Sequence, residues 1–383
     1  MPKNVLRPTT SWWLRYGFDQ SRWVLAPIVA ALFFLSGCAK PIYLAKLGWG
    51  QAKVILHTKS NDSVLDDPGV DLTVKEKIRL ILETKTYGEE KIGLAETSNF
   101  LGFYQVKGPC LVYVVSACPK GRLKSHEWWF PITGKVTTKG FFHDKEARRE
   151  KEKLERKGLD VFVQGAQAYS TLGWFKDPIF STILHQDPVL IMNVVLHELT
   201  HATVFFKDEL DFNEQIANFV GCQGAVDFSG EKFGPGSSAQ EWARGVMDDG
   251  ILFARFMRGI CQRLSELYAQ PLSAAVKLRE REQIFLEAKE EFKALREQFR
   301  TDFYLGFEEV RLNNAAVLAM ARYVANIEQI QRVYEKLGKD LSKTVAFFKR
   351  MESEGVSDPQ GYLATWLGEK DAKEAVSLHQ DDE

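Results

Sequence analysis

Hydrophobic residues recur every three or four positions along most of the second half of the chain, which is the period of an α-helix with one buried face. From residue 187 onward this pattern predicts an almost unbroken series of helices, over 189–206, 212–227, 238–269, 274–303, 313–337 and 339–353. Asp187 followed by Pro188 is typical of the start of the first of them. Two earlier helices are predicted, one after Asp71 and one over 144–158 that ends at Gly158.

A different pattern covers residues 100–142, where β-branched and aromatic residues are interrupted by Gly and Pro. This pattern predicts a small antiparallel sheet, and residues 159–171 return to extended structure. No repeat, low-complexity tract or Pro/Gly/Ser linker divides the chain after residue 38. We therefore expect one mainly helical α+β domain over 38–383, with the sheet in a part of about 38–180 and helices over about 187–383.

The first 37 residues have the order of a secretory signal. Basic residues come first, and an uncharged run from Trp23 to Leu35 follows. That run is shorter than the roughly 20 residues that cross a bilayer. The segment LSGC, which ends at Cys38, then resembles the lipobox of bacterial lipoproteins.

This resemblance implies that residues 1–37 are a signal peptide and that Cys38 becomes the lipid-carrying first residue. Ala39 in the next position is similar to lipoproteins sorted to the outer membrane. We therefore expect an exported lipoprotein that faces the periplasm and is held at the membrane by the lipid on Cys38. An ordinary cleaved signal, or a buried helix that contains Cys38, is the alternative.

Charge and cysteine content argue against two classes of protein, those that bind nucleic acid and those held together by disulfides. The 50 basic and 51 acidic residues leave no overall basic field, so nucleic acid is not expected as a partner. Five cysteines are too few and too scattered for a disulfide framework. Cys110 and Cys118 lie on one predicted strand, about 26 Å apart if it is straight, so only a hairpin between them permits a bridge. Cys222 and Cys261 are expected in the core, with a disulfide as the alternative.

The helix after Pro188 contains the sequence HELTH, residues 197–201. His197 and His201 are four residues apart, so they lie one turn apart on the same helix face and can bind one metal ion. Glu198 lies beside them, where it can take a proton from a water molecule. The pattern predicts a zinc site, and the alternative is two histidines that form hydrogen bonds in the core.

Catalytic zinc usually has three protein ligands and one open position. Glu214 is our predicted third ligand, because it lies near the start of the next helix in an Asn-Glu-x-x-Ala setting that resembles the gluzincin metallopeptidases. Asp208 and Asp211 on the preceding segment are the alternatives. A ligand on a helix is held more rigidly than one on a loop, which favours Glu214.

The chain as a whole resembles the bacterial putative aminopeptidase family of predicted lipoproteins. The resemblance covers most of residues 35–330 and depends on the lipobox, the HELTH helix and three further segments, AYSTLGWFKDP (168–178), DFNEQIA (211–217) and LNNAAVLAMARY (312–323). The predicted sheet keeps the Phe-Pro and Gly-Phe-Phe landmarks but lacks the expected cysteines and tyrosine. The resemblance implies a zincin-like fold and an aminopeptidase that acts on peptides or proteins. It is the only basis for expecting cleavage at the N-terminus of the substrate.

Roles for individual residues follow as hypotheses. Glu198 is predicted to be the general base. Tyr323 is predicted either to donate a hydrogen bond to the transition state or to be a core aromatic. Tyr169 is predicted to lie on an edge strand that pairs with an extended substrate. The alternative function is a non-catalytic envelope lipoprotein, for which an apolar stripe within 276–300 could bind a partner.

Overall fold

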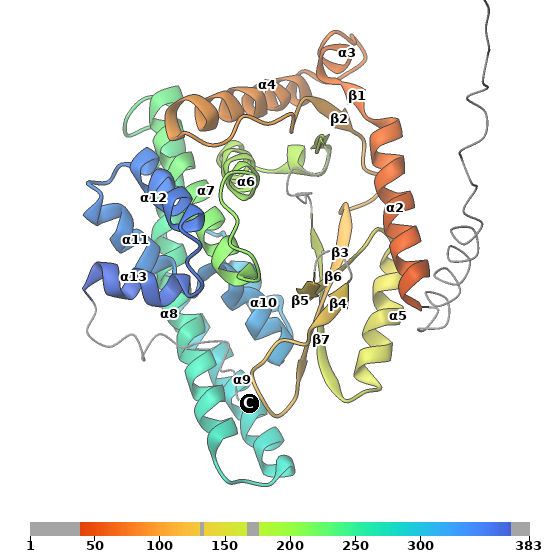
Figure 1. Cartoon of the computed structure of the whole chain (residues 1–383), viewed down its shortest axis with the longest axis vertical. Coiled ribbons are helices and arrows are strands. Elements are labelled where there is room, and N and C mark those ends of the chain that lie inside the picture. Colours follow the sequence, from red (N-terminus) through yellow and green to blue (C-terminus); the bar gives the residue numbers. More distant parts are fainter. Residues whose placement is uncertain (1–38, 131–133, 167–175, 369–383) are drawn as a thin grey trace, which may run out of the picture. The chain divides into compact units, whose positions relative to one another are not determined.

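The computed structural model describes residues 39–130, 134–166 and 176–368 (Figure 1). The chain forms two compact units, Met1–Leu56 and His57–Glu383. The described residues of the first unit, 39–56, all belong to one helix, α2 (Ala39–His57). No helix in these described ranges has the length and hydropathy needed to span a bilayer.

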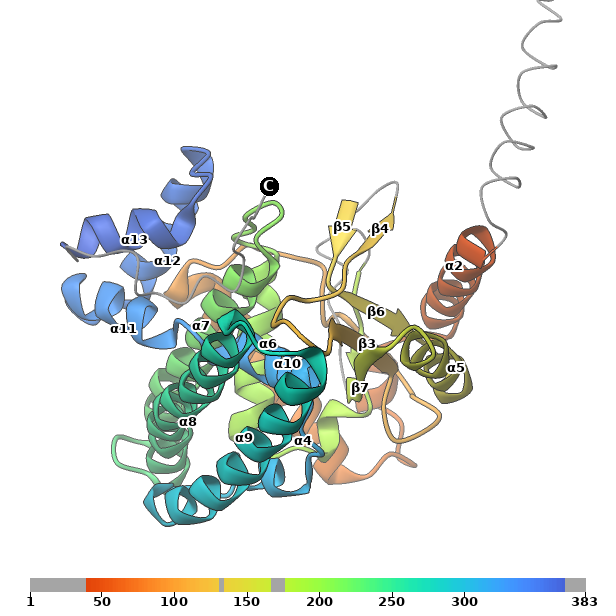
Figure 2. The same ribbon diagram turned by 90° about the horizontal axis from the view of Figure 1, so that it is seen from below.

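The helices of the second unit centre on α7 (Leu210–Phe233). This helix packs against α6 (Pro188–His201), α8 (Ser238–Ala269) and α10 (Asn314–Val324). Figures 1 and 2 both place α6 and α10 beside α7. The other α-helices of this unit are α3 (Asn61–Leu65), α4 (Leu72–Tyr87), α5 (Asp144–Glu155), α9 (Ala274–Leu295), α11 (Ile327–Lys336), α12 (Leu341–Ser353) and α13 (Pro359–Leu367).

Polar caps explain where several of these helices begin. Asp187 accepts a hydrogen bond from the Val189 N–H at the start of α6, and Ser237 does the same for Gln240 at the start of α8. Asp71 caps α4, which continues through a π-helical turn, Gly88–Ile92, and stops at Gly93 in the left-handed conformation (φ 82°).

The strands form three small sheets. The largest is antiparallel, with the order β6 (Thr138–Phe141), β3 (Val112–Pro119), β7 (Leu159–Ala166), and Tyr113 pairs with both Phe141 and Gly165. Helices α5 and α10 both pack on it, from its two sides in Figure 2. The second sheet joins β1 (Lys59–Ser60), β2 (Gly102–Tyr104) and β8 (Ile179–Phe180), with β2 and β8 parallel, and the third pairs β4 (Trp128–Phe130) with β5 (Gly134–Val136). The mainly helical α+β prediction is confirmed, although three small sheets replace the one expected.

Three predicted helices were too long. The helix predicted over 189–206 ends at His201, and the other two end early for reasons that involve distant residues. The helix predicted to reach 303 ends at Leu295, because the backbone N–H groups of Arg300 and Thr301 donate to the buried Asp249 carboxylate instead of to helix carbonyls. The helix predicted over 313–337 is interrupted between α10 and α11, where Arg258 donates to the Ala325 carbonyl oxygen.

Asn314 connects the largest sheet to the helices. Its side-chain N–H groups donate to carbonyl oxygens at the end of β3 and in the turn after it, and its Oδ1 accepts from the Tyr268 hydroxyl on α8. Its backbone N–H donates to Asp160 on β7, a carboxylate that also forms a buried ion pair with Arg281 on α9 (2.7 Å). Asn314 is fully buried at the start of α10, so the position of this helix depends on the sheet.

The cysteines of the described residues are all free thiols. Cys118 is buried on β3, a continuous strand with no hairpin toward Cys110, and its thiol donates to carbonyl oxygens of the following turn. Cys222 and Cys261 are buried on α7 and α8, as expected for core residues.

Candidate metal centre

Helix α6 is almost entirely buried, which fixes the orientation of its two histidines. Val195, Leu196 and Leu199 on this helix have no exposed surface. The Nε2 atoms of His197 and His201 approach each other to 3.1 Å, with the rings edge to face. The two imidazoles therefore converge at one point, as the four-residue spacing predicts.

Glu214 on α7 completes the group. Its Oε2 lies 3.4 Å from His197 Nε2 and 3.7 Å from His201 Nε2. Ligand atoms bound at 2.0–2.2 Å to a tetrahedral zinc ion lie about 3.3–3.5 Å from one another. The three observed separations bracket that range, and two imidazoles with one carboxylate are the donor set of catalytic zinc sites. The residues present therefore fit a zinc ion.

The two alternative ligands lie elsewhere. Asp211, in the first turn of α7, accepts a hydrogen bond from Arg322 Nε at 2.7 Å and forms an ion pair with it. Asp208 is exposed on the loop between α6 and α7, and neither carboxylate belongs to the His/Cys/Asp/Glu cluster found among the described residues. Asn213 exchanges two hydrogen bonds with the Phe206 backbone and closes this loop.

The Glu214 carboxylate and the two imidazoles stabilise each other's charged forms. Burial disfavours the ionised form of Glu214, but hydrogen bonds and charge from the two imidazoles outweigh burial and hold its pKa far below the usual value. Burial likewise works against protonated His201, and contact with Glu214 outweighs it and raises the pKa of that imidazole. The trio therefore favours an ionised carboxylate.

Glu198 is placed differently from the other three residues. Burial raises its pKa, and the positive charge of the two histidines only partly opposes this effect. Its Oε2 is buried and has no hydrogen-bond partner among the described residues. A buried carboxylate oxygen without a partner is costly, so this atom is a candidate to bind a water molecule or substrate group.

Two glycines on α7 allow α6 to approach closely enough for this geometry. A Cβ atom at Gly221 would lie 2.8 Å from the Asn193 carbonyl oxygen and 3.3 Å from His197 Cβ. At Gly224 a Cβ atom would lie 2.6 Å from Leu196 Cδ1. Both contacts are shorter than side chains tolerate, so glycine at these positions sets the distance between the ligand-bearing helices.

Helix α10 brings Tyr323 toward the same centre. The side-chain amides of Gln215 and Asn218 on α7 donate to the carbonyl oxygens of Arg322 (3.1 Å) and Tyr323 (3.0 Å). Burial raises the pKa of the Tyr323 phenol, and the nearby negative charges of Glu214 and, more weakly, Glu198 raise it further. The phenol is therefore kept in its neutral, hydrogen-bond-donating form, and it lies within electrostatic range of Glu214 and Glu198.

The polar contacts that hold α10 in place could not be predicted from the sequence. Arg322 is buried and links Asp211 to Thr137 Oγ1 (3.1 Å), which lies between β5 and β6. These partners are 111 and 185 residues away along the chain. Gln215 and Asn218 are the exception, because both are polar residues on a largely buried helix next to a predicted ligand. Of the other predicted site residues, Cys38 and Tyr169 lie outside the described residues.

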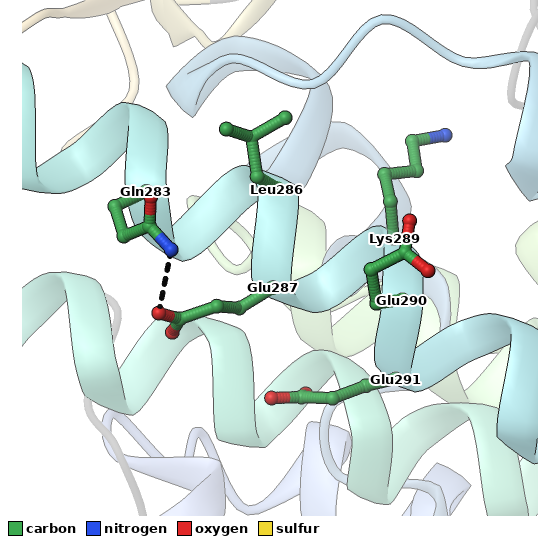
Figure 3. Close-up of a pocket in the computed structure, with 6 residues that line it drawn as sticks. All are labelled: Gln283, Leu286, Glu287, Lys289, Glu290 and Glu291. Carbon is green, nitrogen blue, oxygen red and sulfur yellow. Dashed lines mark hydrogen bonds between the residues drawn. The ribbon is translucent and has the colours of Figure 1, made fainter.

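A hollow along the surface of α9 also carries several carboxylates, but it does not resemble the metal centre. Figure 3 shows its acidic side chains spread along the helix surface instead of converging on one point. Glu287 accepts a hydrogen bond from Gln283, and Glu291 is paired with Arg263. These carboxylates lie on an exposed helix surface, where neighbouring side chains already pair with them.

Comparison with known proteins identifies the family of the chain. No curated protein and no solved structure matches the chain. A family model described as "Putative aminopeptidase" matches residues 42–360, a range that contains all the metal-centre residues described above. Because the match covers most of the sequence, the chain belongs to the putative aminopeptidase family.

Proposed function

We propose that this protein is a zinc-dependent peptidase, and that it removes residues from the N-terminus of peptides at the cell envelope. The observation that carries the proposal is the convergence of His197, His201 and Glu214, with Glu198 buried beside them. The family assignment supports a peptidase-like activity, and it is the basis for proposing action at the N-terminus.

The zinc ion would be held by His197 Nε2, His201 Nε2 and a Glu214 carboxylate oxygen. When bound, zinc supplies a Lewis acid that polarises the scissile carbonyl and makes water more acidic. The ionised Glu214 offsets part of the metal charge, since hydrogen bonds from both imidazoles lower its pKa.

Glu198 moves the proton in this proposal. Its carboxylate takes a proton from the attacking water and then delivers it to the leaving amine. Burial raises the pKa of Glu198, which makes its carboxylate a stronger base than an exposed one. The phenol O–H of Tyr323 donates to the oxygen that becomes negative in the transition state. Tyr169 stays a candidate for pairing with the substrate backbone.

Attachment to the envelope is part of the same proposal. The lipobox that ends at Cys38 supports export and a lipid anchor, and Ala39 supports the outer membrane, with the site in the periplasm. Peptides or unfolded proteins are the proposed substrates, because an extended chain can reach a buried metal centre.

The test compares Glu198→Gln with the wild type and with Glu231→Gln, an exposed carboxylate near the far end of α7. Zinc content is measured by elemental analysis, and cleavage of a mixed peptide pool by mass spectrometry. We expect about one zinc per chain in all three proteins. Glu198→Gln should lose activity by about 10²–10⁴-fold, whereas Glu231→Gln should not.

Other outcomes have definite meanings. Full activity in Glu198→Gln refutes the role of Glu198, and internal cleavage refutes the N-terminal specificity. Zinc without any hydrolysis favours the alternative, a non-catalytic envelope lipoprotein. The apolar stripe on α9 gives that alternative little support, because Phe285, Ala288 and Phe292 are buried in the protein's own core.

A further inference from the structure

Helix α2 exposes an unusual amount of apolar surface. Thirteen large hydrophobic side chains are exposed in the described part of the chain, and five of them belong to this 19-residue helix. They are Ile42, Leu44, Trp49, Ile55 and Leu56. A single exposed leucine needs no explanation, but a group of this size on one helix indicates a surface that is covered in the working protein.

Three of these five residues, Ile42, Trp49 and Leu56, follow a helical stripe. With Ala45 and Ala52 they are spaced by three and four residues, so they share one face, which we call the outer face. Ala45 is exposed and Ala52 is half-buried. Ile42, Trp49 and Leu56 are 57%, 61% and 72% exposed. The outer face of α2 is therefore apolar.

The charges on α2 favour a lipid surface. The helix contains no Asp or Glu. Lys46 and Lys53 are exposed and each follows a residue of the outer face by one position, so both lie along the same edge of it. Lys53 Nζ lies 5.5 Å from the centre of the Trp49 ring. Lysines beside an apolar face complement anionic headgroups, and tryptophan is enriched at membrane interfaces.

The position of α2 in the chain points to the same occupant. Ala39, the first described residue of α2, directly follows Cys38 in the sequence, so a lipid on that cysteine would hold this end of the helix at the bilayer surface. Lys46 and Lys53 lie in its interior, and α2 is not apolar enough to span a membrane. An exposed apolar face with basic residues along its edge can lie along the interface, with that face in the headgroup region.

We infer that the outer face of α2 lies in the headgroup region of the membrane that carries the Cys38 anchor, as a second attachment beside the lipid. This inference rests on the lipid anchor in the proposed function. It adds that α2 itself contacts the bilayer, which fixes the direction in which the chain leaves the membrane.

The test uses the full acylated protein in vesicles of phosphatidylethanolamine and phosphatidylglycerol. A spin label is attached at Ala45→Cys on the outer face and, as a matched control, at Ala294→Cys on an exposed position of α9. Collisions with oxygen, which concentrates in lipid, and with a water-soluble nickel chelate are measured for each label. The signal of the unsubstituted protein is subtracted, because its native cysteines remain.

We expect the label at position 45 to show a severalfold higher ratio of oxygen to nickel collisions than the label at 294. Equal ratios, with lipid on Cys38 confirmed by mass spectrometry, overturn the inference and leave the anchor intact. Protection of position 45 from both reagents also overturns it, since protein then covers the face. A chain without lipid on Cys38 overturns the anchor and this inference together.

Discussion

Gly221 offers the sharpest test of how the metal centre depends on the packing of two helices. Its added Cβ atom would lie 2.8 Å from the Asn193 carbonyl oxygen, and ordinary contacts begin at 3.4 Å. Helices α6 and α7 therefore have to separate locally by about 0.6 Å. Metal–ligand distances tolerate only about 0.2 Å. We expect Gly221→Ala to weaken zinc binding, although it is seven residues along α7 from Glu214.

The effect on stability has two opposing parts. Alanine gains about 1 kcal/mol over glycine inside a helix, and overpacking costs about 1–3 kcal/mol. Gly221→Ala should therefore change the free energy of unfolding by between about zero and 2 kcal/mol, in the destabilising direction. Gly259 on α8 is the matched control, because nothing lies within 4 Å of its added Cβ atom. Gly259→Ala should gain about 0.5–1 kcal/mol and leave zinc binding unchanged.

The assay measures the zinc dissociation constant by competition with a chromophoric chelator, and stability by urea unfolding of the zinc-free protein. If Gly221→Ala binds zinc as tightly as Gly259→Ala and is equally stable, the contact with Asn193 does not set the distance between α6 and α7. The reasoning from glycine to ligand geometry then fails.

Four further predictions test other parts of the structure. Tyr323→Phe should lower kcat by about 10²-fold with little change in KM, as steady-state kinetics on a cleaved peptide will show; an unchanged kcat makes Tyr323 a core aromatic. Arg281→Met leaves the buried Asp160 carboxylate without its ion-pair partner, so urea unfolding should show a loss of about 3–5 kcal/mol; a loss below 1 kcal/mol contradicts this. Zinc at 100 times its dissociation constant should stabilise the native protein by about 2.7 kcal/mol, seen as a higher Tm that His201→Ala lacks. Burial raises the pKa of the thiols of Cys118, Cys222 and Cys261 to about 12, 11 and 12. Alkylation at pH 8, followed by mass spectrometry, should therefore modify these thiols only after unfolding; fast labelling of the native protein refutes their burial.

Much of the fold could be predicted because its signals are local. The predicted range of α8, 238–269, agrees with the structure at both ends, since Ser237 caps its start and the segment after Ala269 contains Pro271. The strand around Cys118 and the charged helix that ends near Gly158 depend equally on neighbouring residues. The errors at Arg300 and Ala325 have another origin, because Asp249 and Arg258 act on the backbone from far along the chain.

The residues of the candidate site likewise fall into those that local sequence predicts and those that long-range contacts place. The spacing of His197 and His201 is a property of one helix, and Glu214 follows closely enough for the next helix to deliver it. The position of Tyr323 depends on Arg322, whose partners at Asp211 and Thr137 are brought together only by folding. No periodicity in a single sequence shows such contacts, so the role of Tyr323 stayed open between donor and core residue.

The hydrogen bonds of Asn314 have a consequence for how the second unit unfolds locally. Its side chain bonds to the end of β3, to the turn that follows and to α8, while its backbone N–H bonds to β7. Local opening of the sheet therefore breaks bonds that also define the start of α10, the helix that carries Tyr323. Amide protons of β3, β7 and α10 should then exchange with solvent as one unit, at a rate set by sub-global unfolding. A peptidase built this way would lose its active geometry in a single step, not gradually.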